Sequence, residues 1–495
     1  MSEGVLPVRI RKILLAGLAL GPVAAPASAE TLREALIKAY KTNPTLEAQR
    51  ANLRATDEGV PIARSSALPN ISLQTNYAEL FQNANNAFVV PQRALQSNGQ
   101  ATVPLYSGGQ VKNSIKAAED RVLAGRATLR GTEADLFTNT VGAYMDVIRD
   151  QAVVALNEQN IRVLEVNLQA SRDRFQVGDL TRTDVAQSEA RLSLAQSQLQ
   201  QAQARLIASR ETYIRVIGSP PGDLEPPPPL PGLPRDPDSA VQIALQDSPT
   251  LQAARKNVDA TKYDVRVARA ARLPQLGAFV NSGYFNYLGS LSSPFGANIP
   301  QSGINAQGGL QLTIPLYQGG QPAARIRQAQ AREGVAQEQL TDSERGVVAQ
   351  VRSAFAFYRG ALEVIESATA AVNANKLSLE GVRAENGVGN RTVIEVLNAE
   401  QELLNSQVTL VTARRDAYVA GFAVLAAMGH AEAKDLGLDG DMPLYDPVIN
   451  YRRVRNNISD WAGERSPKPV APTTSNTPAQ DAKVTRSPAA AGPGN

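Results

Sequence analysis

The chain has 495 residues, a formal net charge of +3, a single histidine and no cysteine. Disulfides, thioether-linked lipids and His/Cys metal clusters are therefore excluded, and the single histidine, His430, makes no case for catalysis. We expect neither an enzyme nor a cofactor-binding protein.

Residues 1–29 have the order of parts of a secretory signal peptide. The basic residues Arg9, Arg11 and Lys12 precede an apolar stretch, which ends at the small residues Ala-Ser-Ala. A short buried helix is the alternative, but the position and order favour a signal peptide. Removing this segment leaves the charge close to neutral, so the pI of about 9.0 is weak evidence for nucleic acid and we expect no nucleic-acid partner.

Two nearly identical octapeptides, VPLYSGGQ at 103–110 and IPLYQGGQ at 314–321, indicate an internal duplication. The offset between the copies is 205 residues around NPTLEAQR and SPTLQAAR, and 211 from the octapeptide onward. The six-residue change falls in an interval that should contain a loop. We expect the following organisation: a repeat at 30–218, a Pro-rich linker at 219–238, a second repeat at 239–432, a C-terminal segment at 433–461 and a disordered tail at 462–495.

Within each repeat the pattern is a helix, two strands and then two long helices. The strands belong to hairpins at about 68–106 and 273–317. ISLQTNY alternates apolar and polar residues, and LQLTIPL places Leu310, Leu312, Ile314 and Leu316 on one face. Ten of the 24 aromatic residues lie in the two hairpins. Packing within the hairpins is one explanation, but apolar alternation and clustered aromatics are typical of strands that face lipid, so we expect contact with a lipid bilayer.

The segment from Gln110 to Gln176 contains no proline and is rich in helix-forming residues. An unbroken helix of this length would reach roughly 100 Å. Gly178 breaks it, and a second helix is expected from about Thr183 to Ile217. The second repeat follows the same plan from Gln321.

The repeated octapeptide is expected to join a strand to a long helix. Proline removes a backbone donor and therefore favours strand ends, while paired glycines permit backbone angles that other residues resist. The predicted joint residues are Pro69, Pro104, Gly108 and Gly109 in the first repeat, and Pro274, Pro315, Gly319 and Gly320 in the second.

Four strands are too few to close a barrel, and open strand edges do not occur in lipid. Several chains must therefore share one barrel: two would supply eight strands and three would supply twelve.

The signal peptide, the tandem repeats and the NPTL, PLYxGGQ and VGNRTVIEVLNAEQEL segments together resemble the TolC-type outer-membrane efflux family. The resemblance covers roughly residues 30–432. It implies an α+β membrane protein, a homotrimer with a twelve-strand β-barrel continued by a twelve-helix periplasmic α-barrel. Members are exit ducts in the Gram-negative outer membrane. They work in tripartite efflux or type I secretion, with a periplasmic adaptor (membrane fusion) protein and an inner-membrane RND or ABC transporter.

Two other classes stay open from the sequence. A non-transport periplasmic coiled-coil protein accounts for the helices but not for the paired hairpins. A conventional porin accounts for the strands but not for the long helices.

The resemblance also implies a periplasmic constriction where the long helices turn. It places Thr183 and Asp184 of the first repeat there, with Arg391, Glu395 and Asn398 of the second. Arg391 is expected to face Asp184 across adjacent helix pairs. The family often has an aromatic at the position of Asn386 and an acid at that of Asn398. The alternative is that these residues are ordinary helix caps and surface groups.

Overall fold

The computed structural model describes residues 30–82, 90–230, 232–291, 298–464 and 466–484. The expected signal peptide and the last eleven residues of the tail lie outside the described residues. The disorder expected for the tail stays a prediction.

The duplicated order of elements is confirmed. The first repeat contains α1 (Leu32–Thr42), α2 (Pro44–Asp57), α3 (Gly59–Ser65), β1 (Asn70–Glu79), β2 (Arg93–Tyr106), α4 (Gln110–Gln176) and α5 (Arg182–Ile217). The second contains α6 (Pro237–Asp247), α7 (Pro249–Ala270), β3 (Gln275–Asn286), β4 (Ser302–Thr313), α8 (Gln321–Gly387) and α9 (Val393–Met428). A short 3-10 helix (Leu438–Gly440) and α10 (Pro447–Val454) follow.

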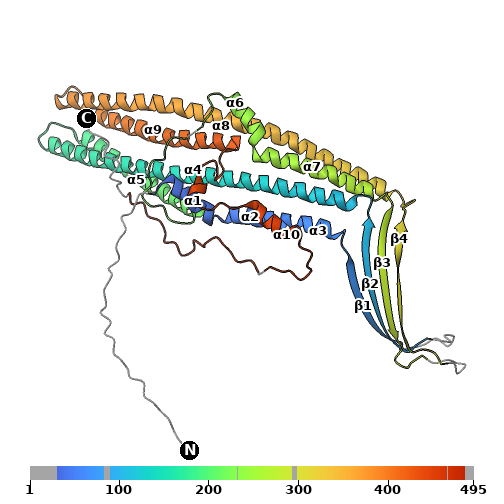
Figure 1. The fold of residues 1–495 in the computed structure, drawn as a ribbon. Coiled ribbons are helices and arrows are strands. Elements are labelled where there is room, and N and C mark those ends of the chain that lie inside the picture. Colours follow the sequence, from blue (N-terminus) through green and yellow to red (C-terminus); the bar gives the residue numbers. More distant parts are fainter. Residues whose placement is uncertain (1–29, 83–89, 231, 292–297, 465, 485–495) are drawn as a thin grey trace, which may run out of the picture.

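The helices form an elongated body with the strands at one end (Figure 1). Helices α4 and α8 have 67 residues each, and α5 and α9 have 36 each. Each long helix packs against the shorter helix that follows it, and α4 also packs against α9, so the two helical hairpins lie side by side. Among the helices of the described ranges, none has an apolar stretch of the length needed to cross a membrane.

The strands form one antiparallel sheet in the order β1-β2-β3-β4. Directly opposed residues of an antiparallel pair share a face, so the register Ile71–Ala101–Val280–Gly308 defines one face of the sheet. This face is apolar and carries exposed side chains of Ile71, Leu73, Val280, Leu310 and Leu312. The predicted alternation is therefore present, although β4 ends at Thr313, before Ile314 and Leu316.

The other face of the sheet is polar. Its central side chains are amides: Gln74, Asn98, Gln100, Asn281, Asn305 and Gln307. No strand residue of this face, from Asn70 to Ala78, Ala94 to Pro104, Gln275 to Phe285 and Gly303 to Thr313, is Asp, Glu, Lys or Arg. The sheet thus has an uncharged polar face opposite the apolar one.

The main core lies where α1, α2 and the segment 431–442 pack on α4 and α5. Phe137, Tyr144 and Tyr213 are fully buried there. The hydroxyl of Tyr144 donates to the backbone oxygens of Glu30 (2.8 Å) and Glu225 (2.7 Å), so it ties the start of the first repeat to the linker. A second core joins α6 to α8 and α9 around Val351, Phe355 and Met428. Both cores lie away from the turns that join α4 to α5 and α8 to α9. Near those turns the buried apolar cluster has only three residues, Leu164, Ala195 and Leu397.

Candidate functional site

The first turn between long helices is built by Gly178 and a capping box. Gly178 has φ +83°, a left-handed conformation that favours glycine. Thr181 then caps α5: its hydroxyl accepts from the backbone N–H of Asp184 (3.3 Å), and the Asp184 carboxylate accepts from the backbone N–H of Thr181 (3.0 Å). Such reciprocal bonds satisfy donors that a helix start leaves unpaired. The turn is therefore locally rigid.

The second turn repeats this arrangement at the 211-residue offset. Gly389 has φ +83°, Thr392 caps α9, and the Glu395 carboxylate accepts from the backbone N–H of Thr392 (2.8 Å). Arg391 adds a contact that the first turn lacks, since Leu180 occupies the equivalent position. Its guanidinium forms ion pairs with Glu385 (2.7 Å) and Glu395 (2.6 Å) and so links the end of α8 to the start of α9.

Charge at this second turn is strongly stabilised. The pKa of Glu395 is lowered to about 2, first by the backbone N–H of Thr392 and then by Arg391. The two carboxylates raise the pKa of Arg391 above its already high ordinary value. Both side chains are partly exposed, so solvent screens the pair and limits its strength. The turn nevertheless carries fixed charges throughout the neutral pH range.

The structure brings the predicted constriction residues to the same end of the molecule but not into the expected pair. Within one chain, Arg391 forms ion pairs with Glu385 and Glu395, whereas the Asp184 carboxylate accepts a hydrogen bond from the hydroxyl of Thr181. An Arg391–Asp184 ion pair is not among the contacts of the described residues. Thr183 is exposed one position beyond the start of α5. The role of these residues at a constriction stays a prediction that depends on contacts between chains.

Asn398 joins the two hairpins. Its side-chain oxygen accepts from Arg191 of α5 at 2.5 Å. Just behind this bond, Leu164, Ala195 and Leu397 form a small buried cluster shared by α4, α5 and α9. This bond and the apolar cluster link α5 to α9 near the two turns within one chain.

Several residues of this region escaped the sequence analysis: Thr181, Arg191, Glu385, Thr392 and Glu400. The carboxylate of Glu400 is almost fully buried and accepts from Asn167 (2.8 Å) and Arg383 (3.0 Å). At the 211-residue offset the first repeat has Arg172 and Glu189, which also form an ion pair (2.7 Å). The Thr-x-x-Asp/Glu capping boxes and the charged pair that recurs in both repeats are the signals that point to Thr181, Thr392 and Glu400.

The strand–helix joints lie at the opposite ends of α4 and α8. Gly109 and Gly320 cap these helices with φ +83° and +80°. Gly108 and Gly319 precede them with φ +62° and +59°. Pro69 and Pro274 stand immediately before β1 and β3, and Pro315 lies just beyond β4. Pro104 lies inside β2, at the irregularity where the β2–β3 register shifts, which is a position that tolerates a missing donor.

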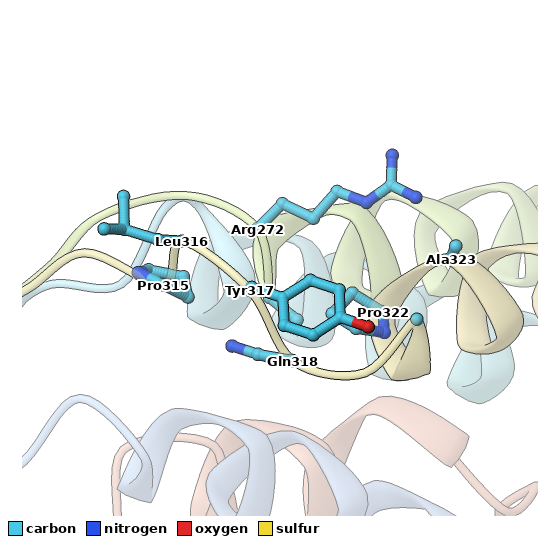
Figure 2. Close-up of a pocket in the computed structure, with 9 residues that line it drawn as sticks. Arg272, Pro315, Leu316, Tyr317, Gln318, Pro322 and Ala323 are labelled. Carbon is cyan, nitrogen blue, oxygen red and sulfur yellow. The ribbon is translucent and has the colours of Figure 1, made fainter.

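The second joint is more open than the first. Figure 2 shows the ring of Tyr317 beside Pro322 at the start of α8, with Leu316 pointing away from the ring. Leu316 and Tyr317 are 92% and 88% exposed, whereas their equivalents Leu105 and Tyr106 are 55% and 53% exposed. A groove of about 290 Å³ lies between this joint and Arg272. Adjacent apolar side chains this exposed are typical of a surface that contacts another molecule.

The model of the outer membrane efflux protein family matches residues 35–219 and 240–430 of the chain, one match for each repeat. The chain belongs to this family. It is 34% identical over 455 residues to the outer membrane efflux protein BepC of Brucella suis biovar 1 (strain 1330), which covers 92% of this chain and 96% of BepC. It is 26% identical over 485 residues to the outer membrane protein TolC of Escherichia coli (strain K12), covering 93% and 96%.

Solved structures agree in fold with this family placement. A crystal structure of CusC aligns with a TM-score of 0.69 at 18% identity, covering 80% of this chain and 91% of CusC. The resemblance stated from the sequence is thereby confirmed, together with the α+β fold. As a family member, the chain is an outer-membrane protein whose long helices extend into the periplasm.

Proposed function

We propose that the chain is the exit duct of a tripartite efflux or type I secretion system. In this proposal three copies share one barrel and one helical tunnel. A periplasmic adaptor couples them to an inner-membrane RND or ABC transporter, and substrates leave the cell through the tunnel. The observation that carries the proposal is that equivalent positions of the two repeats are covered differently within one chain. If copies of the chain form a ring, a neighbouring copy covers the positions that are left open.

The asymmetry is clearest at the joints. In the first repeat, Gly108 lies against Leu273: a Cβ added to Gly108 would be 2.7 Å from the leucine Cβ. Its counterpart Gly319 has nothing within 4 Å of an added Cβ. The repeat counterpart of Leu273 is Leu68, at the far edge of the same sheet. If Leu68 of a neighbouring copy covers Gly319, every joint has the same environment.

The sheet supports the same neighbour. Strands β1 and β4 are the edges of the four-stranded sheet, and edges in lipid must be paired. The β2–β3 ladder gives the register for a β4–β1 pair between copies. Ala101 pairs with Val280, and the repeat offsets convert these positions to Leu312 and Thr75. Both residues lie on the apolar face, so the derived register keeps lipid-facing residues together.

The helices follow the same rule. Helix α4 packs against α9 within the chain, so α8 should pack against α5 of the next copy. Consistent with this expectation, an apolar groove of about 680 Å³ runs along α8 and α9, and Phe357 on its wall is 73% exposed. Phe357 is the counterpart of Asp146, which is paired with Arg415 of α9 inside the chain. The α4–α9 contact within a copy would then contain an ion pair, and the α8–α5 contact between copies would be apolar. The two kinds of contact would alternate around the ring.

Disulfide cross-linking tests this arrangement directly, because the chain has no cysteine. We expect Leu312→Cys combined with Thr75→Cys to give covalent trimers on a non-reducing gel. Opposed side chains lie about 4.5–5.5 Å apart at the Cβ atoms. Within one chain the two edge strands are separated by two others, roughly 14 Å in total, so an internal disulfide cannot form.

The control is Thr313→Cys combined with Thr75→Cys. These positions lie on opposite faces of the sheet in the derived register and should stay uncross-linked. A double-cysteine protein that reaches the outer membrane but stays monomeric after oxidation contradicts the proposal.

In the proposed duct, we expect the periplasmic turns to select ions and substrates by their charge. The polar face of the sheet would line the barrel, and its strand residues carry no charge. The second turn carries Glu385, Arg391 and Glu395, and the first carries Asp184 beside the ion pair of Arg174 with Asp179. Three-fold repetition would bring these charges close together around the axis. We propose that they form the constriction and that an adaptor shifts the balance between closed and open turns.

A further inference from the structure

Trp461 is the only tryptophan in the chain, and it is 96% exposed. It lies in a short irregular segment, residues 455–464, that follows α10. Ile458 of the same segment is 72% exposed. Local hydrogen bonds organise the segment: Ser459 N–H donates to the side chain of Asn457 (3.1 Å), and Gly463 N–H donates to the backbone of Trp461 (3.0 Å). Two large apolar side chains are thus displayed outward.

The segment is held close to the strands. Arg64, on α3, donates to the side chain of Asn456 (2.5 Å) and to the backbone oxygen of Arg455 (3.4 Å). Helix α3 ends at Ser65, and β1 begins at Asn70. Tyr451 of α10 packs on the cluster formed by Val60 of α3 and Val122 of α4. Figure 1 accordingly shows α10 and the segment after it beside α2 and α3, toward the end of the body that carries the sheet.

The charges around Trp461 suit a phospholipid surface. Helix α3, α10 and the segment after α10 together carry four arginines and only two carboxylates. The arginines are Arg64, Arg452, Arg453 and Arg455, and the carboxylates are Asp460 and Glu464. Arg453 is paired with Glu464. Tryptophan is enriched at membrane interfaces because its ring is apolar and its N–H is polar, and arginine is attracted to lipid phosphates.

We propose that Trp461 and Ile458 insert into the periplasmic surface of the outer membrane, while the neighbouring arginines contact lipid phosphates. This contact would be a second attachment besides the sheet. Farther along, the chain returns to α5, where Arg210 donates to the backbone oxygens of Asp481 (2.6 Å) and Lys483 (2.8 Å). The C-terminal region would therefore tie the middle of the helical body to the membrane. The inference depends on the placement of the sheet in the membrane.

The single tryptophan allows a direct test by intrinsic fluorescence. The full chain would be reconstituted into vesicles of phosphatidylethanolamine and phosphatidylglycerol, with part of the lipid brominated near the ester end of its acyl chains. We expect an emission maximum shifted to shorter wavelength relative to the unfolded protein. We also expect loss of most of the intensity in brominated vesicles and weak quenching by aqueous iodide.

Two relocated tryptophans in a Trp461→Phe background serve as controls. Leu312→Trp reports on the apolar face of the sheet and should be quenched by brominated lipid. Phe175→Trp reports on the far end of α4 and should be quenched only by iodide. Emission of Trp461 that responds to iodide and not to brominated lipid overturns the proposal. If Leu312→Trp also fails to respond to the lipid, the placement of the sheet is wrong as well, so the two failures are distinguishable.

Discussion

Gly108 lies in direct contact with Leu273, where the joint between β2 and α4 meets the end of α7. An added Cβ at position 108 would be 2.7 Å from the Leu273 Cβ and 3.1 Å from the backbone oxygen of Ala270. The same glycine has φ +62°, which other residues rarely adopt. Two independent constraints therefore require glycine where the first hairpin of strands meets the end of α7.

We expect Gly108→Ala to destabilise the assembled protein. The left-handed backbone alone costs about 1–2 kcal/mol for a residue with a Cβ, and the contact with Leu273 adds to it. The measurement is the temperature at which oligomers dissociate on a gel. Gly334→Ala is the control, because Gly334 lies inside α8 with open space around an added Cβ, and alanine there should stabilise by up to about 1 kcal/mol. Equal stability of the two variants would show that the joint is not constrained.

The two faces of the sheet should respond oppositely to charge. Val280 is at the middle of β3 on the apolar face, and Gln307 of β4 is on the polar face opposite Asn281. Val280→Arg places a charge in lipid at a cost of about 2–4 kcal/mol near the midplane, repeated in each copy. Gln307→Arg should assemble normally. The amount of oligomer in the outer-membrane fraction measures both, and equal amounts would contradict the face assignment.

The sequence predicts the long helices well because the determinants are local. Uninterrupted helix formers and the absence of proline define 110–176, and α4 has those bounds. The glycine breaks place both turns correctly, since Gly178 and Gly389 are in the left-handed region. The cap of α5 was expected near Thr183, whereas Thr181 fills that position together with Asp184.

Contacts between distant segments were not predictable in the same way. Arg191 reaches Asn398 only because α5 and α9 lie side by side, and nothing in either segment alone specifies that partner. Arg391 has acidic residues both six positions before it and four positions after it, so its partners are local. An ion pair of Arg391 with Asp184 across helix pairs stays a prediction, because it depends on packing between copies. The local pairs are present in a single chain, because pairs within a tight turn need no tertiary packing.

Glu133 should make stability depend on pH. Its carboxylate is half-buried on α4 and accepts from the backbone N–H of Ala433 (2.5 Å). Burial, the main cause, raises the pKa of Glu133 to about 7 from an ordinary value of 4.5. The folded chain therefore retains a proton that the unfolded chain releases, so the free energy of unfolding decreases as pH rises from about 4.5 to about 7.

Glu133→Gln keeps the acceptor oxygen and removes the ionisation. We expect the variant to be more stable than the wild type at about pH 8, by about 1–3 kcal/mol, with a smaller difference at about pH 5. Thermal unfolding at the two pH values measures this difference. Glu165→Gln is the control, because Glu165 is exposed on the same helix and should have no such effect. A stability difference that is the same at both pH values would contradict the buried-carboxyl interpretation.

The ion pairs at the second turn should control ion flow through the proposed duct. Arg391 bridges Glu385 and Glu395 and so holds the end of α8 against the start of α9. Arg391→Ala removes that bridge and leaves two carboxylates without their cation. We expect a severalfold higher single-channel conductance in planar bilayers and stronger cation selectivity. Glu395→Gln removes a negative charge and should weaken cation selectivity, with a smaller change in conductance.

A matched variant distinguishes a constriction from an ordinary surface pair. The pKa of Glu395 is lowered to about 2, so its carboxylate stays charged until the pH falls to about 2. The stability that this charge contributes is complete above the ordinary pKa of 4.5 and is lost as the pH falls from 4.5 to about 2. The conductance of the wild type should accordingly show no step from this group between about pH 5 and 8. Arg121→Ala removes a comparably exposed ion pair with Asp264 near the strand end of α4 and should leave conductance unchanged. Wild-type conductance and selectivity in Arg391→Ala, with assembly intact, would reduce Arg391 to a helix-end contact and move the constriction elsewhere.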